Sequence, residues 1–412
     1  TSHSASTITN VDQEPPSLKT YHENEIGKGQ RIVILAGPHK TGTSSLQYNF
    51  VRWTKQRTKG EPNATNTEMS TSTTAIWDDW VWPIPDAVAK IYSPTITNSS
   101  SSSSSPSEVD KAYYPLMEAL RSPERKIPDR EIFHLYTPDK IIQLFSDSIA
   151  ESWELGYNLV FGSEAMDLLV KLPEGQEMLK KFSDRILPIK VAPQEGREKG
   201  RRKKTTSDTN GSEITVVVTY RTPKIDHLIS NWHQVCKGKD TQPFFKYITT
   251  TSNKLGVLNG LGLVEIFLKN TNWNVALVDY EFVKESEWDL TSYIACHFLK
   301  VECDLETKQI VGLVGEENPT IKNVRKSQRP PNLSDEALAE MDSIMMAHDC
   351  NYKYLFEAEK EWKDRLISLH KLGIDKMMDN CKTYGHDYPN LDEMKEKLVQ
   401  VAKKHGPKKL GS

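Results

Sequence analysis

Residues 31–50 read R-I-V-I-L-A-G-P-H-K-T-G-T-S-S-L-Q-Y-N-F. The run from Ile32 to Ala36 is continuously apolar and rich in branched residues, which is typical of a strand buried on both faces. Gly37 and Pro38 end this run abruptly. The residues from Thr43 onward then suit the first turns of a helix, so the stretch predicts a strand, a compact loop and a helix.

A loop between a strand and a helix N-terminus is well suited to binding anions. Its backbone N–H groups lack helical partners, and the positive end of the helix dipole points into the turn. Lys40 adds a full positive charge to the loop. We therefore expect a phosphate- or sulfate-binding loop here.

This loop departs from the Walker A pattern G-x-x-x-x-G-K-[ST], in which lysine directly follows the second glycine and reaches the β/γ-phosphates beside Mg²⁺. Gly37 and Gly42 keep the spacing, but Thr43 stands in the lysine position and Lys40 precedes Gly42 by two residues. Residues 275–279, V-A-L-V-D, could pass as the strand that carries a magnesium-binding aspartate. A nucleotide kinase or other NTPase is the second interpretation.

A second strand end carries an arginine. Residues 214–220, I-T-V-V-V-T-Y, are the most convincing strand in the chain, and Arg221 follows them. From Pro223 onward apolar residues recur at helical spacing, which puts Ser230 two turns into the next helix. A guanidinium can donate two parallel hydrogen bonds to a phosphate and a serine hydroxyl can complete the shell, so Arg221 and Ser230 can bind one small anion together.

The rest of the chain alternates between strand and helix patterns. Residues 156–161 and 273–280 predict two more buried strands. Residues 137–153 predict a helix with Thr137 as its N-cap and Pro138 in its first turn, and further helices are expected at 113–121, 241–270 and 290–301. The alternation predicts an α/β fold with a mainly parallel sheet flanked by helices and joined by right-handed crossovers.

Composition suggests how the chain is divided. Residues 1–30 read as a polar tail, and residues 31–330 as one α/β domain. This domain contains low-complexity insertions near 93–108, which are serine-rich, and 190–213, which are strongly basic. Residues 331–412 are expected to form a helical extension that packs on the domain.

Three tryptophans follow a polar stretch. Residues 54–75 are rich in Thr, Asn and Lys and are expected to form a loop, and W-D-D-W-V-W-P-I-P then brings Trp77, Trp80 and Trp82 close together. Such a cluster could stack on a sugar. Packing beneath the long loop is the plainer interpretation.

Charge and cysteine content exclude some classes of protein. The formal net charge of -3 argues against a general nucleic-acid coat protein. The five cysteines show neither C-x-x-C spacing nor a dense framework, so we expect mostly buried free thiols rather than a zinc ribbon or a small disulfide scaffold. No apolar stretch approaches the roughly eighteen residues that span a bilayer.

The compartment is left open by the sequence. The chain starts at Thr1 without a methionine, and removal of an N-terminal anchor would place the domain in a lumen such as that of the Golgi. N-x-S/T triplets at Asn63, Asn98, Asn210 and Asn332 would suit that location, but their number is close to chance in so Ser/Thr-rich a sequence.

Four motifs resemble the sulfotransferases that use 3′-phosphoadenosine 5′-phosphosulfate, especially those of bacterial and unicellular-eukaryote type. P-H-K-T-G-T-S-S-L-Q looks like their 5′-phosphosulfate-binding loop, and V-V-V-T-Y-R-T-P-K-I-D-H-L-I-S looks like their 3′-phosphate-binding strand and helix. L-V-F-G-S-E-A-M-D resembles their S-S-E strand end, and V-A-L-V-D-Y-E-F resembles their Y-E-D-L strand. The resemblance implies a P-loop-like three-layer sandwich over roughly residues 31–330.

The resemblance also implies a reaction, the transfer of a sulfuryl group from this co-substrate to an acceptor hydroxyl without a metal. Lys40 would neutralise the leaving bridge oxygen, while Arg221 and Ser230 would bind the 3′-phosphate. Glu164 and His39 are the candidate general bases. The residues expected to hold the 5′-phosphosulfate are Lys40, Thr41, Gly42, Thr43, Ser44 and Ser45.

The acceptor is expected to be a carbohydrate, because of the tryptophan cluster, the basic insertion and the lumenal setting that removal of an N-terminal anchor would imply. A small alcohol, a phenol or a protein tyrosine stays open as acceptor, and no nucleic-acid partner is expected. The alternatives from other classes are the nucleotide kinase or NTPase and a non-catalytic nucleotide- or glycan-binding module. The sequence does not indicate an oligomeric state.

Overall fold

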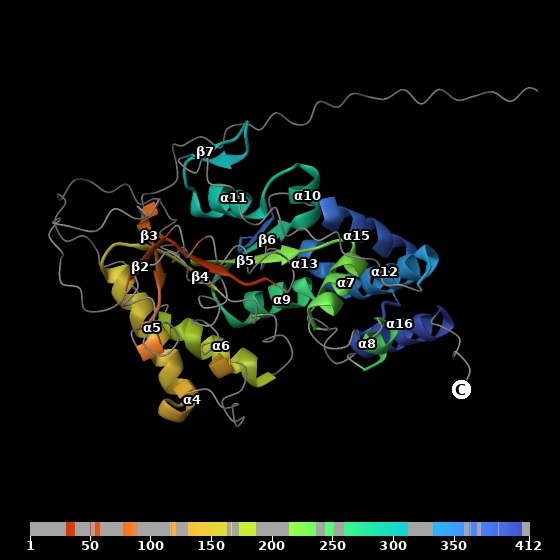
Figure 1. Ribbon diagram of the computed structural model, residues 1–412, viewed down its shortest axis with the longest axis horizontal. Helices are drawn as coiled ribbons and strands as arrows, with labels where there is room; N and C mark the ends of the chain where they lie inside the picture. The colour runs from red at the N-terminus through yellow and green to blue at the C-terminus, as the bar shows by residue number, and fades with distance from the viewer. Residues whose placement is uncertain are drawn as a thin grey trace, which may run out of the picture.

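The computed structural model of the 412-residue chain is an α/β structure built around one parallel sheet (Figure 1). Residues 1–29 of the expected tail (residues 1–30) and the two low-complexity insertions lie outside the residues that the structure describes. Those described are residues 30–37, 50, 54–57, 77–85, 87–88, 116, 118–120, 131–162, 166, 173–186, 214–235, 244–250, 259–311, 333–357, 362, 364–368, 372–385 and 387–405.

Seven strands form the central sheet in the order β2-β3-β4-β1-β5-β6-β9, and each neighbouring pair is parallel. The strands are β1 (Ile32–Leu35), β2 (Thr54–Arg57), β3 (Trp77–Pro83), β4 (Asn158–Gly162), β5 (Ile214–Tyr220), β6 (Asn274–Asp279) and β9 (Leu366–Ser368). All of β1 and all of β5 except Thr215 are buried, because helices cover both faces of the sheet. The continuous apolar runs therefore predicted β1 and β5 correctly.

Helices lie on both faces of the sheet (Figure 1). One face carries α5 (Pro138–Glu154), α6 (Pro173–Ile186) and α9 (Gly260–Asn270). The other carries α10 (Tyr280–Glu285) and α11 (Leu290–Ile294), which continues as the π-helix η3 (Ala295–Leu299) and is followed by a hairpin of β7 (Cys303–Asp304) and β8 (Gln309–Ile310). None of the helices in the described ranges has the length and apolar character needed to cross a membrane.

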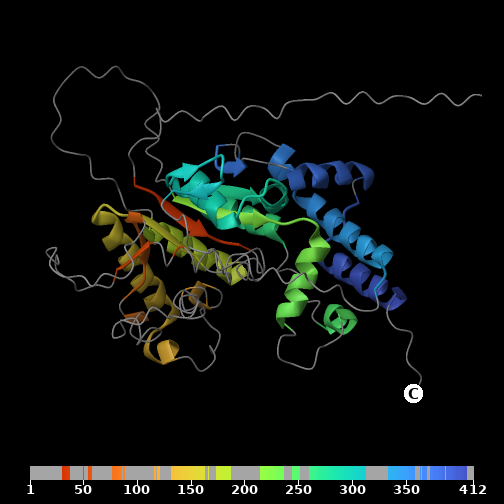
Figure 2. The same ribbon diagram turned by 45° about the horizontal axis from the view of Figure 1, so that its top comes forward.

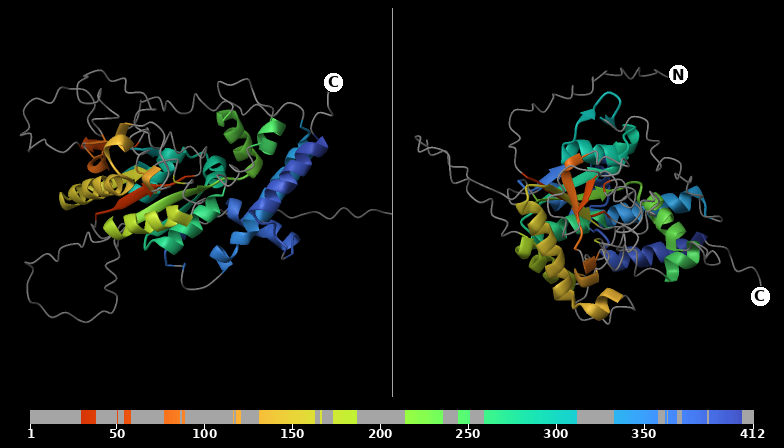
Figure 3. Two further views of the ribbon diagram at one scale, coloured as in Figure 1. Left: turned by 90° about the horizontal axis from the view of Figure 1, so that it is seen from below. Right: turned by 60° about the vertical axis from the view of Figure 1, so that its left-hand side comes forward.

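A further group of helices gathers at the carboxyl ends of the strands, at the opposite end of the molecule from α5 (Figures 2 and 3). It consists of α7 (Lys224–Val235), α8 (Phe244–Thr250), α12 (Asp335–Asp349), α15 (Leu372–Thr383) and α16 (Leu391–His405). The short helices α4 (Glu131–Leu135), η5 (Cys350–Tyr352) and α13 (Tyr354–Glu357) are also described, and residues 116 and 118–120, within the helix expected at 113–121, are helical.

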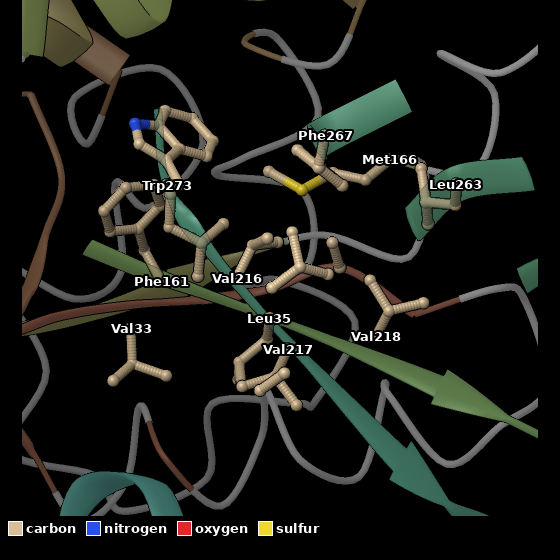
Figure 4. Close-up of a cluster of buried hydrophobic side chains, with 14 of the residues drawn as sticks. Val33, Leu35, Phe161, Met166, Val216, Val217, Val218, Leu263, Phe267 and Trp273 are labelled. Carbon is tan, nitrogen blue, oxygen red and sulfur yellow. The ribbon is translucent and has the colours of Figure 1, made fainter. Parts of the chain in front are cut away.

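Two apolar clusters hold these layers together. The larger lies between the sheet and its helices. Figure 4 shows part of it, where Val216 of β5 lies on the same side of the strands as Phe267 of α9, and Leu35 and Val217 lie on the other side. The smaller cluster contains no strand and joins α7, α8, α12 and α16 through residues such as Leu228 and Met341. The C-terminal helices are thus packed on α7, the helix that follows the arginine-bearing strand.

Most predicted elements are present. The helix expected at 137–153 is α5, where the Thr137 hydroxyl accepts a hydrogen bond from the backbone N–H of Lys140 (3.3 Å) and Pro138 is the first helical residue. The strands expected at 156–161 and 273–280 are β4 and β6 with slightly different ends. The helix expected at 241–270 is described as two helices, α8 and α9, and residues 251–258 between them lie outside the described ranges.

The expectation of a loop throughout residues 54–75 was wrong at its start, where Thr54–Arg57 forms the edge strand β2. Its sequence, T-K-Q-R, has no apolar run, so it becomes a strand by pairing with β3 rather than by its own pattern. A second strand was also missed. Leu366–Ser368, within the stretch expected to be helical, pairs with β6 as the opposite edge strand β9.

The tryptophan cluster belongs to the sheet. W-D-D-W-V-W-P is strand β3, and the Trp80 and Trp82 side chains are only 3% and 1% exposed. These two rings are therefore unavailable for stacking on a sugar, and they lie within the larger apolar cluster of the protein.

The expectation of mostly free cysteines was also wrong. Cys296 and Cys303 form one disulfide, which links η3 to β7, and Cys350 and Cys381 form another, which links the end of α12 to α15. Cys236 lies outside the described residues. The cysteine spacing gave no sign of these pairs, because the partners of the longer link are 31 residues apart and meet only through helix packing.

Candidate functional site

The order of the strands identifies one place where a ligand can bind. From β1 the chain continues to β2 at one edge of the sheet, whereas from β5 it continues to β6 on the other side of β1. The connections that leave the neighbouring strands β1 and β5 thus run in opposite directions, and in open parallel sheets ligands bind at the carboxyl ends of the strands at such a point. Leu35 at the end of β1 pairs with Val217 of β5 on one side and with Gly162 of β4 on the other.

Two segments with predicted functional residues follow strands at this edge, one after β1 and one after β4. The predicted anion loop begins at Gly37, which is buried and follows the hydrogen bond from the N–H of Ala36 to Val217 O (2.9 Å). The segment of Glu164 begins after Gly162, and Phe50, beyond the loop, is helical and buried as expected. The remaining predicted loop and base residues, His39, Lys40, Thr41, Gly42, Thr43, Ser44, Ser45 and Glu164, lie outside the described residues.

Arg221 is the first residue after β5 and is half-buried at the carboxyl edge. Its guanidinium carbon lies 5.1 Å from the centre of the Tyr280 ring, within the range of a cation–π contact. Tyr280 follows β6, the strand next to β5, so two adjacent strand ends supply the pair. Ser230 is half-buried on α7, the helix that starts three residues after Arg221.

The start of α7 is held by two carboxylates of α12. Asp342 accepts a hydrogen bond from the backbone N–H of Ile225 (2.9 Å), so a carboxylate already occupies part of this helix terminus. Asp349 forms an ion pair with Lys224 (2.8 Å), and the two side chains are 4% and 3% exposed. An anion at this edge would therefore be bound by side chains such as Arg221 rather than by the N-terminus of α7.

Glu281 stabilises the centre of the same turn. Its Oε2 accepts a hydrogen bond from the Thr222 hydroxyl (2.5 Å), and its Oε1 pairs with Lys376 of α15. Burial by itself would raise the pKa of Glu281, but the hydrogen bonds from Lys376 and Thr222 lower it below its ordinary value. Glu281 thus stays ionised and paired, which makes it a structural anion rather than a proton acceptor.

Asp279, at the end of β6, caps two helices at once. Its Oδ1 accepts from the backbone N–H groups of Glu281 (3.1 Å) and Phe282 (3.2 Å) at the start of α10. Its Oδ2 accepts from the N–H of Gly373 (2.5 Å) at the start of α15. Burial raises the pKa of Asp279, against the lowering effect of these backbone bonds. Both oxygens therefore bind the protein itself, which leaves the side chain poorly placed to ligate Mg²⁺ as a Walker B aspartate would.

Position 373 has no room for a side chain, because the start of α15 lies close to Thr222 and Asp279. A Cβ atom at this position would lie 2.7 Å from the Thr222 hydroxyl oxygen and 3.1 Å from Asp279 Oδ1. The first turn of α15 therefore lies directly against the ends of β5 and β6. Among the described residues, no group of three or more His, Cys, Asp or Glu side chains could hold a metal ion.

In comparisons with protein families, curated proteins and solved structures, none matched this chain. The function must therefore be inferred from the residues and from the geometry of this edge.

Proposed function

We propose that this protein is a sulfotransferase that transfers a sulfuryl group from 3′-phosphoadenosine 5′-phosphosulfate to an acceptor hydroxyl, on a P-loop-like fold. The observation that carries the proposal is the strand order, because the anion loop after β1 and Arg221 after β5 leave adjacent strands at the point where the connections diverge. A nucleotide with phosphates at its 3′ and 5′ positions presents two anionic groups, one for each of these strand ends.

The residues of this chain would divide the work as follows. Arg221 and Ser230 would bind the 3′-phosphate, with the Tyr280 ring supporting the guanidinium. Lys40 and the loop Thr41 to Ser45 would hold the 5′-phosphosulfate and stabilise charge on the leaving phosphate. Glu164 or His39 would accept the proton of the acceptor hydroxyl.

The NTPase interpretation is weaker because of Asp279. Magnesium at such a site needs a carboxylate oxygen with room for the ion, and both oxygens of Asp279 accept backbone hydrogen bonds from helix termini. Transfer of a sulfuryl group needs no metal when a lysine and a helix terminus neutralise the leaving group. The same argument supports Lys40, displaced from the Walker position, as the principal cation.

The two disulfides support a secretory compartment. Such bonds persist in oxidising environments and are rare in the cytosol. A lumenal enzyme would encounter glycans, and the basic insertion at residues 190–213 would attract polyanionic ones, so we propose a carbohydrate hydroxyl as the acceptor. The buried Trp80 and Trp82 lend this choice no support.

The test is a calorimetric titration with 3′-phosphoadenosine 5′-phosphate and, separately, with ATP and Mg²⁺. We expect the 3′-phosphorylated nucleotide to bind and Mg-ATP to bind more weakly, and a preference for Mg-ATP would overturn the proposal. Labelled 3′-phosphoadenosine 5′-phosphosulfate is then incubated with a panel of glycans, phenols and alcohols. Lys40→Ala should abolish transfer while the nucleotide still binds, whereas Lys140→Ala, an exposed lysine on α5, should change neither. Binding without transfer to any acceptor would favour the non-catalytic module.

A further inference from the structure

The turn that carries Arg221, residues 220–225, is held by two separate elements. Asp349 and Asp342 of α12 bind residues near both of its ends, and Glu281 accepts a hydrogen bond from its centre. Each of these carboxylates is more than 50 residues away in the chain from the group that it binds. The position of the guanidinium therefore depends on how the C-terminal region packs.

Asp349 contacts the turn on both sides of Arg221. Its Oδ2 accepts a hydrogen bond from the Tyr220 hydroxyl (3.0 Å) and pairs with the Lys224 ammonium (2.8 Å). The Lys224 nitrogen also lies 4.1 Å from the centre of the Tyr220 ring. Since Tyr220 precedes Arg221 and Lys224 follows it by three residues, one buried carboxylate fixes the backbone on both sides of the arginine.

We propose that Asp349 is a positioning residue for the 3′-phosphate site. It holds Tyr220 and Lys224, and through them it keeps the guanidinium of Arg221 oriented for bidentate hydrogen bonding to the 3′-phosphate. Two parallel hydrogen bonds require the planar fork to face the phosphate, so small rotations of the backbone at Arg221 weaken them. This inference rests on the proposed function, and it makes α12 part of the donor site.

The experiment separates positioning from folding by using two nucleotides. The affinities of the full chain for 3′-phosphoadenosine 5′-phosphate and for adenosine 5′-phosphate are measured by calorimetry, and their ratio reports the contribution of the 3′-phosphate. Asp349→Asn should lower this ratio about tenfold while changing the affinity for adenosine 5′-phosphate little, because only the arginine has lost its orientation. A loss of structure alone would weaken the binding of both nucleotides to the same degree.

Two further variants allow for a folding failure, since Asp349→Asn leaves the buried Lys224 ammonium without its ionised partner. Tyr220→Phe removes only the hydroxyl hydrogen bond and should lower the ratio by a few-fold. Asp349→Leu combined with Lys224→Met replaces the whole buried pair by apolar side chains and should lower it about as much as Asp349→Asn. The control is Glu340→Gln, on the same helix as Asp349. It breaks the exposed pair of Glu340 with Lys404 of α16 and should leave the ratio unchanged.

The outcomes distinguish the two proposals. Equal affinity of the wild-type protein for both nucleotides would contradict the proposed function. A wild-type preference for the 3′-phosphorylated nucleotide that every folded variant retains in full would overturn the role of Asp349 alone.

A second observation, independent of the first, concerns His348. Its Nδ1 lies 3.0 Å from the carbonyl oxygen of Pro389, which can only accept, so Nδ1 carries the proton and Nε2 of the neutral ring is an acceptor. The Nε2 atom is buried and has no hydrogen-bond partner among the described residues. The side chain lines a cavity of about 10 Å³ between α7, α12 and α16, which holds about one water molecule.

The occupant of this cavity follows from charge and hydrogen bonding. Lys224 and Asp349 both line the cavity and form an ion pair with each other, so they offer no net charge to a bound ion, while the lone pair of His348 Nε2 requires a hydrogen-bond donor. We infer that one ordered water fills the site, donating to His348 Nε2 and bridging α12 to the start of α7. A crystal structure at high resolution should show this water about 2.7–3.2 Å from Nε2 and should lose it in His348→Phe. An empty cavity, or a water retained in His348→Phe, would overturn the inference.

Discussion

At the level of single residues, Arg221 is the side chain on which the proposed function depends most. Arg221→Ala should weaken binding of 3′-phosphoadenosine 5′-phosphate by about 2–4 kcal/mol, because a charge-assisted pair is lost at a half-buried position. Arg221→Lys keeps the charge but not the planar fork, so its loss should be intermediate. Calorimetry measures both values. Arg185→Ala on α6, whose side chain contacts Asp139, is the control, and an unchanged affinity in Arg221→Ala would refute the 3′-phosphate assignment.

Glu281 makes a second prediction at this level, on the pH dependence of stability. Its pKa is lowered in the folded state, so it stabilises the fold fully above its ordinary value of 4.5, and that stabilisation is lost as the pH falls through the folded pKa. The free energy of unfolding of Glu281→Gln should therefore be lower than that of the wild type near pH 7, and the gap should close at acidic pH. Urea unfolding from pH 3 to 7 measures the gap. A gap that stayed constant would mean that Glu281 is not selectively stabilised in its ionised form.

The sequence located Arg221 correctly at a strand end, but it could not reveal the residues that hold it. The apolar run of β5 and the following Pro223 fix that strand end locally. Asp342 and Asp349, in contrast, lie 117 and 129 positions from the groups that they bind. In sequence they look like ordinary charged residues of a surface helix, and only the packing of α12 on α7 makes them part of the site.

At the level of elements, the strands with a local sequence pattern were predicted, and those that depend on a distant partner were missed. The sequences of β1, β4, β5 and β6 are apolar runs because these strands are buried on both faces, so they were predicted. β3 is also an inner strand, but its sequence W-D-D-W-V-W-P contains two aspartates and it was not predicted as a strand. The edge strands β2 and β9 are short, T-K-Q-R and L-I-S, and each becomes a strand because an existing neighbour offers hydrogen bonds. Pairing with a partner far away in the chain is not visible in so short a segment.

The two disulfides should stabilise their elements to different degrees. Cys350 and Cys381 are separated by 31 positions and join α12 to α15, whereas Cys296 and Cys303 are separated by only 7. Closing the longer loop removes more entropy from the unfolded chain, about 3–4 kcal/mol against about 2 kcal/mol for the shorter one. Replacing both cysteines of each pair by alanine and measuring urea unfolding tests this. An equal or reversed order would show that strain or residual structure dominates.

At the scale of the whole molecule, the C-terminal region contributes both to the sheet and to the carboxyl ends of the strands, where the ligand is proposed to bind. It supplies β9 next to β6, the carboxylates that hold the Arg221 turn, and the first turn of α15 against Thr222 and Asp279. A region that only packed on the surface of the domain would not contribute both a strand of the sheet and the carboxylate partner of the buried Lys224. The sheet and the C-terminal helices are therefore expected to fold as one cooperative unit.

This expectation can be tested by shortening the chain. A protein ending at residue 332 would lose β9, leave the edge of β6 unpaired, uncover the apolar side of α7 around Leu228 and Trp232, and leave Lys224 without Asp349. We expect it to aggregate or to lack a cooperative unfolding transition, as measured by size-exclusion chromatography and thermal circular dichroism. A chain ending at residue 405, which keeps every described helix, is the control and should unfold like the full chain. A monomeric 1–332 protein that bound 3′-phosphoadenosine 5′-phosphate with full affinity would show instead that the C-terminal helices are dispensable, and the role assigned to Asp349 would be lost with them.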